Sequence, residues 1–306
     1  MANYLVTGAA GFIGAALAKK LLEYGHCVVT IDNLSTGFIE NIPEEAVFIE
    51  GNCADPEVYK KIPKEKYDAI FHIAGQSSGE VSFDDPIYDI RTNTESTLLL
   101  LEFALKNGCS RFIYAGSMSV YGIKPNRAIA ESEECIPQSF YGVGKLASEH
   151  YMRIYNQYGI NSTSLRLFNV YGPGQNLSNS RQGMVSIFVA QMLDNNSINV
   201  KGSGERYRDF IYIDDVVHAY ISCLNNEFTW GRVINVGTGV RTTVSELIQI
   251  LNGISGLNLP VKYQGSTSGD IHGIFANNEI MMDLLFQFKP TGLQDGLRKM
   301  WLSVIS

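Results

Sequence analysis

Short apolar runs alternate with longer amphipathic stretches along most of this 306-residue chain. The runs are rich in Val, Ile and Phe, and the stretches between them repeat apolar residues at helical spacing. Strands alternating with helices predict a parallel sheet covered on both faces, an α/β fold of the doubly wound Rossmann type. The predicted strands are 4–7, 27–31, 46–50, 69–73, 111–115, 162–168 and 233–236, and the predicted helices lie around 17–22 and over 56–61, 90–107, 141–158, 185–194 and 242–254.

The regular alternation ends near residue 168. A polar segment over 177–183 indicates the entry to a smaller region of mixed α/β structure, in which Asp214 is expected to cap a helix. We therefore expect a Rossmann domain formed by residues 1–168 and 209–237, and a smaller substrate-binding region formed by residues 169–208 and 238–306.

Three glycines, Gly8, Gly11 and Gly14, follow the first predicted strand with the spacing G-x-x-G-x-x-G. They would let the backbone approach a pyrophosphate at a helix N-terminus. Asp32 ends the second strand, 18 residues after Gly14, where a carboxylate can accept hydrogen bonds from an adenosine ribose. No Arg or Lys follows over 33–37, and a carboxylate repels a 2′-phosphate, so the sequence favours NAD over NADP.

Small or polar residues follow three of the predicted strands, at Gly51-Asn52, Ala74-Gly75 and Gly116-Ser117. The carboxyl ends of parallel strands meet at one edge of a sheet, where such folds bind ligands. This edge therefore has room for an extended cofactor.

A tyrosine and a lysine, Tyr141 and Lys145, stand four residues apart at the start of a predicted helix. Residues at this spacing share one face, so a phenol and an ammonium can point into the same cavity. A nearby cation favours the phenolate, and we expect the pKa of Tyr141 to lie below its ordinary value of about 10. Alone this pair is weak, because the spacing often occurs by chance.

The composition argues against several classes of protein. With 24 basic and 31 acidic residues the net charge is −7, which argues against a nucleic-acid surface. The five cysteines are scattered and without C-x-x-C spacing, which indicates reduced thiols, no metal site and a cytoplasmic protein. The chain has no pattern typical of a signal peptide and no uncharged apolar stretch of about 18 residues, so we expect no membrane span.

Taken together, the motifs resemble the extended short-chain dehydrogenase/reductases, and within them the NAD-dependent nucleotide-sugar epimerase/dehydratase group that includes UDP-glucose 4-epimerases. The resemblance covers nearly the whole chain. It rests on Gly8-x-x-Gly11-x-x-Gly14, Asp32-Asn33-Leu34, Phe71-His72-Ile73-Ala74-Gly75, Asn93, Ser117-Met118-Ser119-Val120-Tyr121-Gly122, Tyr141-x-x-x-Lys145, the segment 165–173, the segment 208–216 and Gly269-Asp270.

The resemblance implies a catalytic role for three residues. Tyr141 would remove the proton from a sugar hydroxyl while a hydride leaves the same carbon for the nicotinamide. Lys145 would bind the nicotinamide ribose and lower the pKa of the phenol, and Ser117 would hydrogen-bond the reacting oxygen.

The same resemblance implies binding residues for NAD and for a nucleotide-diphosphate sugar. The NAD site would comprise Gly8, Gly11, Phe12, Ile13, Gly14, Asp32, Asn33, Asn52, Cys53, Ala74, Gly75, Asn93, Tyr141, Lys145, Phe168 and Val170. The substrate site would comprise Ser119, Asn169, Arg208, Asp270 and Ile274, with a guanidinium suited to phosphate.

Two positions depart from the family pattern. Asn52 stands where an aspartate usually contacts adenine, although its carbonyl can still accept a hydrogen bond. Thr267 stands where the family has a basic residue that contacts the diphosphate. Arg206 is a candidate to take over this contact, but it can equally be a solvent-exposed turn residue.

Three functions remain open from the sequence. The first is a nucleotide-sugar epimerase, with UDP-hexose 4-epimerisation through a 4-keto intermediate favoured. The second is a dehydratase or another keto-sugar-forming enzyme, which usually carries a carboxylate where this chain has Met118-Ser119. The third is a non-catalytic NAD sensor, which usually lacks the Tyr/Lys pair.

Further expectations follow the epimerase reading. The size of Ile274 would disfavour a sugar with a 2-acetamido group. UDP is the preferred nucleotide of the substrate, while GDP, CDP and dTDP stay open. The protein would serve carbohydrate metabolism and polysaccharide biosynthesis. The apolar faces of the helices near 90–107 and 145–158 would form a homodimer, a partner inferred by analogy alone.

Overall fold

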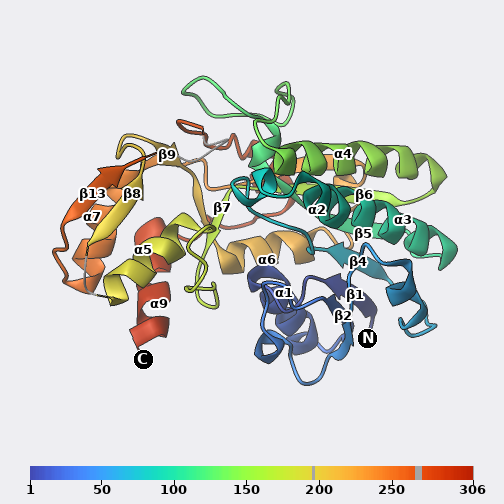
Figure 1. Cartoon of the computed structure of the whole chain (residues 1–306). Coiled ribbons are helices and arrows are strands. Elements are labelled where there is room, and N and C mark those ends of the chain that lie inside the picture. The colour runs from blue at the N-terminus through green and yellow to red at the C-terminus, as the bar shows by residue number, and fades with distance from the viewer. Residues whose placement is uncertain (195–196, 266–270, 306) are drawn as a thin grey trace.

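A parallel sheet forms the centre of the molecule in the computed structural model, which describes residues 1–194, 197–265 and 271–305 (Figure 1). In this part of the chain the sheet has seven strands in the order β3-β2-β1-β4-β5-β6-β11, each paired in parallel with its neighbours. The order confirms the predicted doubly wound fold. The strands are β1 (Asn3–Thr7), β2 (Cys27–Asp32), β3 (Val47–Glu50), β4 (Ala69–His72), β5 (Arg111–Ser117), β6 (Asn161–Leu167) and β11 (Arg232–Val236).

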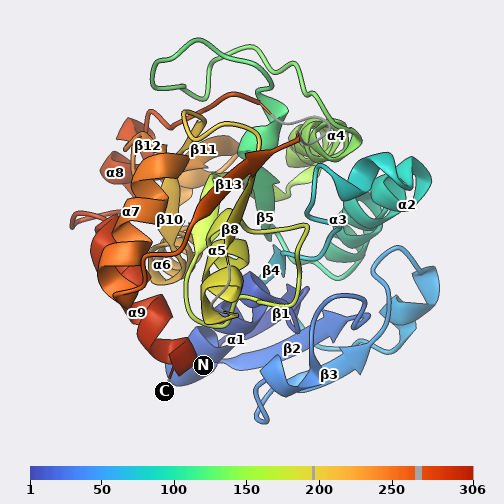
Figure 2. The ribbon, with the colours of Figure 1, turned by 60° about the vertical axis from the view of Figure 1, so that its left-hand side comes forward.

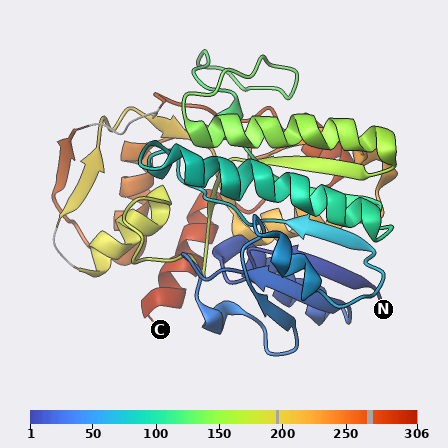
Figure 3. The same cartoon turned by 45° about the vertical axis from the view of Figure 1, so that its right-hand side comes forward.

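Helices cover both faces of the sheet. Alternate strand residues point to opposite faces. Val6, Phe71 and Ile113 belong to a core shared with α1 (Phe12–Glu23) and α6 (Ile213–Ser222). Their neighbours Leu5, Ile70 and Phe112 belong to a second core with α3 (Ser96–Lys106) and α4 (Phe140–Tyr155), which lie side by side in Figure 3. The strands therefore read as continuous apolar runs because both faces are buried.

Two helix starts differ from the prediction. The helix expected at residue 90 begins as α2 (Pro86–Ile90), because Asp85 accepts a hydrogen bond from the Tyr88 N–H and Pro86 occupies the first turn. It continues through a π-helical turn (Arg91–Glu95) into α3. Asp214 makes no cap: it lies inside the first turn of α6, where the helix dipole favours a negative charge.

The smaller region packs against the α1 and α6 side of the sheet and shares its core (Figure 2). Its largest helices are α5 (Met184–Leu193), α7 (Val244–Ser255) and α9 (Leu293–Ile305), with the shorter α8 (Glu279–Leu284). Thr243 begins α7 with a capping box to Glu246. In the described part of the chain the smaller region also contains two two-stranded pairs, β8 (Ile198–Lys201) with β13 (Val261–Gln264) and β9 (Tyr207–Arg208) with β12 (Thr242–Thr243). Its strand β7 (Asn169–Tyr171) pairs with β10 (Phe210–Tyr212), which lies in the segment 209–237 predicted for the Rossmann domain.

Short turns join these elements. The segment predicted as a helix over 56–61 is a 3-10 turn, Pro56–Lys60, with Asp55 as its N-cap. The other 3-10 turns are Ile39–Asn41, Val81–Phe83, Met118–Val120, Asn156–Tyr158 and Glu227–Thr229. Among the described residues, no helix is long and apolar enough to cross a membrane.

Candidate active site

The glycine turn after β1 closes tightly on the end of β4. Gly8 has a φ of +72°, and a Cβ built there would lie 2.7 Å from the Ala74 backbone nitrogen. A Cβ on Gly14 would overlap the Gly8 carbonyl oxygen. Only glycine fits these positions, so the backbone N–H groups at the start of α1 stay accessible to an anion.

Asp32 ends β2 beside this turn. Its carboxylate accepts hydrogen bonds from the Ala10 N–H (3.0 Å) and the Leu34 N–H (2.8 Å). These bonds fix the direction of the carboxylate and leave lone pairs on both oxygens for further donors.

The remaining predicted cofactor residues gather at the carboxyl ends of the strands. Phe12 and Ile13 begin α1 half-buried, Asn33 is exposed, and Cys53 is buried, which raises the pKa of its thiol to about 12. Asn52 uses its carbonyl oxygen to accept from the Ala54 N–H at 2.9 Å, so part of the acceptor capacity expected for adenine serves the local turn.

Asn93 provides a test of whether these residues fit a dinucleotide. It lies in the π-helical turn before α3 and donates to the Gln76 carbonyl (3.0 Å) and to Asp89 (3.2 Å). Its Oδ1 is buried without a hydrogen-bond partner and faces Gly75, where a Cβ would overlap it. A buried acceptor left open beside a glycine needs an external donor, and together with the glycine turn it fits a bound dinucleotide.

Lys145 and Tyr141 lie on the buried face of α4. The Lys145 ammonium donates to the Ala115 carbonyl at 3.0 Å and lies 4.7 Å from the Tyr114 ring centroid and 5.7 Å from that of Tyr141. Ser117 ends β5 next to them and donates to the Ser119 hydroxyl at 3.1 Å. The fold thus brings Ser117, Tyr141 and Lys145 together from two elements.

Burial dominates the electrostatics of this cluster. It raises the pKa of Tyr141 to about 12, with Ser117 opposing the rise and Asp89 adding to it. It lowers the pKa of Lys145 to about 8, while Asp89 and Glu149 oppose the fall. The expected depression of the Tyr141 pKa is therefore wrong, because desolvation of the phenolate outweighs the nearby ammonium.

Two buried carboxylates around Lys145 were not anticipated from the sequence. Asp89 accepts from Gln76 (2.9 Å) as well as from Asn93, and burial raises the pKa of its carboxyl. Glu149 forms a two-pronged ion pair with Arg166, at 2.7 and 3.0 Å, that joins α4 to β6. Glu149 lies four residues after Lys145, so an acidic residue on the buried face of α4 was an available signal.

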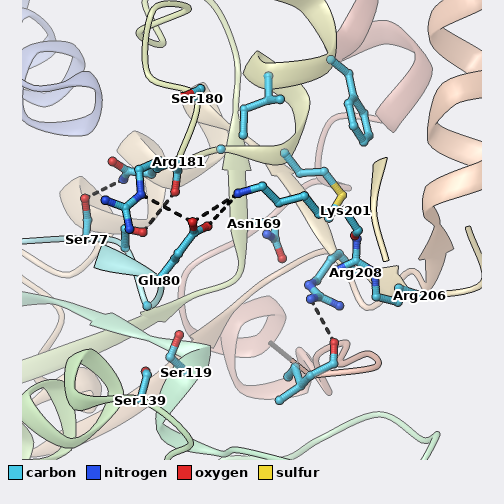
Figure 4. A pocket seen from close by; sticks show the side chains of 18 of the residues that line it. Ser77, Glu80, Ser119, Ser139, Asn169, Ser180, Arg181, Lys201, Arg206 and Arg208 are labelled. Atoms are coloured by element: carbon cyan, nitrogen blue, oxygen red, sulfur yellow. Dashed lines mark hydrogen bonds and ion pairs between the residues drawn. The ribbon is translucent and has the colours of Figure 1, made fainter. Parts of the chain in front are cut away.

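A cavity of about 590 Å³ opens beside the catalytic cluster (Figure 4). Ser119 and Ser139, which lie two residues from Ser117 and Tyr141, line it together with further serines and with amide side chains. Four cations and one carboxylate occupy its walls among the described residues: Arg181, Lys201, Arg206, Arg208 and Glu80.

Three of the five predicted substrate residues line the cavity. Ser119, Asn169 and Arg208 line the cavity, and Arg208 donates to the backbone carbonyls of Tyr207 and Ile271. Arg206 also lines it, with its guanidinium bonded to the carbonyls of Lys201 and Ser203.

Ile274 lies behind the cavity wall. It is 1% exposed in a small core with Val120 and Phe168, against which Met118 packs. Ile274 is absent from the described lining residues, whereas Met118 and Ile271, which pack against the same core, both line the cavity. Val170 is half-buried in β7. Asp270 lies outside the described residues, as do Gly269 and Thr267.

Comparisons with known proteins agree with this geometry. The sequence model of the NAD dependent epimerase/dehydratase family matches residues 4–237. A UDP-glucose 4-epimerase of Mycolicibacterium smegmatis is 33% identical over 302 residues, covering 96% of both chains.

Two solved structures are similar throughout. The UDP-glucose 4-epimerase of Thermotoga maritima, determined with UDP-glucose, superposes with a TM-score of 0.95 at 34% identity, covering 99% of this chain and 98% of that one. The UDP-glucuronic acid 4-epimerase of Bacillus cereus, in complex with UDP-glucuronic acid and NAD, gives a TM-score of 0.88 at 29% identity and 99% coverage of each chain. The chain therefore belongs to the NAD-dependent epimerase/dehydratase family, and the predicted cofactor, NAD, is confirmed.

Proposed function

We propose that this protein is an NAD-dependent epimerase that inverts C4 of a UDP-hexose through a transient 4-keto sugar. The observation that carries the proposal is the cluster of Ser117, Tyr141 and Lys145 beside a cavity whose described lining residues include four cations and one carboxylate. A cationic cavity of this volume suits a nucleoside diphosphate linked to a sugar.

Each residue of the cluster has a distinct task in this proposal. Tyr141 accepts the proton of the C4 hydroxyl and later returns it, and Ser117 hydrogen-bonds the same oxygen. Lys145 binds the nicotinamide ribose and places its positive charge near the phenol. NAD, when bound, supplies the two-electron acceptor and a positively charged ring, and the proximity of that ring favours the Tyr141 phenolate that burial alone disfavours.

The binding roles are likewise proposals. The glycine turn, Asp32 and Asn93 would hold NAD, with the other predicted cofactor residues around them. Asn169 and Arg208 would hold the UDP portion, since a guanidinium can bind phosphate oxygens at two points. The two-part division, with residues 1–168 and 209–237 binding NAD and the remainder binding substrate, fits this arrangement.

The alternative reactions find less support. Dehydratases of this group usually carry an acidic residue in the turn after the catalytic serine, whereas Met118 and Ser119 occupy that turn here and neither can act as a carboxylic acid. A non-catalytic sensor has no need of a buried tyrosine and lysine, whose burial is costly.

We also propose a cytoplasmic homodimer that serves polysaccharide biosynthesis. Free cysteines support a reducing compartment. Exposed apolar side chains on neighbouring helices support a dimer seam, with Ile87 and Ile90 on α2 and Val143, Tyr151 and Ile154 on α4. Sedimentation equilibrium tests the seam: Val143→Glu should yield a monomer, and an unchanged mass would reject this surface.

Incubation with a panel of UDP-, GDP-, CDP- and dTDP-sugars tests the activity. We expect a C4 epimer of unchanged mass, formed from a UDP-hexose. Tyr141→Phe removes the group that moves the proton, so turnover should fall by at least about 100-fold while NAD stays bound. Full activity in this variant would contradict the assignment of Tyr141.

A further inference from the structure

One carboxylate stands among the cations of the cavity. Glu80 lies in the loop after β4 and is the single acidic residue among the described lining residues. In Figure 4 its side chain points into the cavity, between Arg181 and Lys201, which come from other parts of the chain. Its side chain is 25% exposed, so it is partly desolvated even without a ligand.

The Glu80 carboxylate forms ion pairs with both of these cations. The Lys201 ammonium lies 3.2 and 3.3 Å from its two oxygens, and the Arg181 Nε lies 3.5 Å from Oε1. Arg181 also pairs with Asp84 at 2.5 Å. Both cations are therefore already matched by carboxylates of the protein.

The loop that carries Glu80 borders the proposed sugar end of the cavity. A Cβ built on Gly79 would lie 3.5 Å from the hydroxyl of Ser139, which precedes Tyr141 by two residues. Ser77, three residues before Glu80, hydrogen-bonds Gln182, the neighbour of Arg181. A sugar placed for proton transfer to Tyr141 would thus lie close to Glu80.

Resting on the proposed function, we infer that Glu80 sets the charge of the accepted sugar, admitting neutral hexoses and rejecting hexuronic acids. A substrate carboxylate would approach a protein carboxylate in a partly desolvated wall, where like charges repel. The same substrate would also have to break existing ion pairs to reach Arg181 or Lys201. Specificity would arise from an unfavourable contact with the wrong substrate rather than from an extra contact with the right one.

The test compares UDP-glucose with UDP-glucuronic acid. We expect the wild type to favour UDP-glucose in kcat/KM, and Glu80→Gln to reduce this preference by about 10-fold or more, equivalent to about 1.4 kcal/mol. Asp84→Asn is the matched control, because Asp84 also pairs with Arg181 but does not line the cavity. It should change the preference by less than about 3-fold.

Two results would overturn the role of Glu80. One is a wild type that prefers UDP-glucuronic acid, and the other is a preference that Glu80→Gln leaves unchanged. Dissociation constants for both nucleotide sugars, measured by calorimetry on wild type and variants, give the same ratio without turnover. Failure of the proposed epimerisation would therefore appear as absent product, separately from failure of the charge discrimination.

Discussion

At the residue scale, the catalytic cluster is defined by what burial does to its charges. Tyr141 and Lys145 are both buried, and the pKa of each moves toward the neutral form, to about 12 and about 8. Burial by itself therefore favours the protonated phenol near neutral pH. The positive charge of a nicotinamide ring bound beside the phenol would bring the pKa of Tyr141 down.

Replacement of Lys145 should stabilise the protein while inactivating it. Its folded pKa of about 8 lies below the ordinary 10.5, so the folded state binds this proton more weakly than the unfolded chain. Below pH 8 both states are charged and the folded state bears the whole burial cost, which fades as the pH rises towards 10.5. Lys145→Met should then raise the free energy of unfolding by about 1–3 kcal/mol at pH 7.

Urea denaturation at pH 7 and pH 10 measures this effect. The difference between Lys145→Met and wild type should shrink at the higher pH. Lys19→Met, a change at an exposed lysine of α1, is the control and should alter stability little at either pH. A Lys145→Met protein less stable than wild type at pH 7 would show that the ammonium is net favourable.

At the scale of elements, a buried ion pair fixes α4 against the sheet. Glu149 and Arg166 each have side chains only 5% exposed, Ser164 donates to Glu149 at 2.9 Å, and the Arg166 guanidinium lies 4.7 Å from the Tyr121 ring centroid. A Cβ on Gly116 would lie 3.2 Å from Glu149. The pair therefore lies directly behind the end of β5 that carries Ser117.

Removal of one partner of this ion pair should lower the free energy of unfolding strongly. Glu149→Ala leaves a guanidinium buried without its carboxylate, which typically costs about 3–5 kcal/mol. Glu102→Ala on α3 is the control, because Glu102 pairs with Lys106 at 2.9 Å on the surface and should cost less than about 1 kcal/mol. Equal losses in denaturant unfolding would mean that the buried pair does not hold α4 in place.

Much of the element pattern could be predicted from the sequence, because a sheet buried on both faces leaves long apolar runs between amphipathic helices. The pairs β7–β10 and β9–β12 could not, since strands of two or three residues have no measurable period. The start of α2 was missed because Asp85 and Pro86 determine it locally, outside the apolar repeat.

At the scale of the whole molecule, the chain joins a cofactor edge to a substrate cavity. The glycine turn and Asp32 were predictable because their spacing reflects backbone constraints. Glu80, Asp89 and Arg166 were not, because each acquires its role from residues distant in the sequence, such as Lys201 or Glu149. The predicted downward shift of the Tyr141 pKa was wrong for the same reason, since burial is a property of the folded molecule.

The most direct test of the account follows C4 of the sugar. UDP-glucose carrying deuterium at C4 is incubated with the purified protein and NAD in ordinary water, and the product is examined by NMR and mass spectrometry. We predict UDP-galactose of unchanged mass that retains deuterium at C4, because oxidation and reduction occur at that one carbon. A product lighter by one water molecule, or a C4 epimer that has lost its deuterium to solvent, would contradict the central claim.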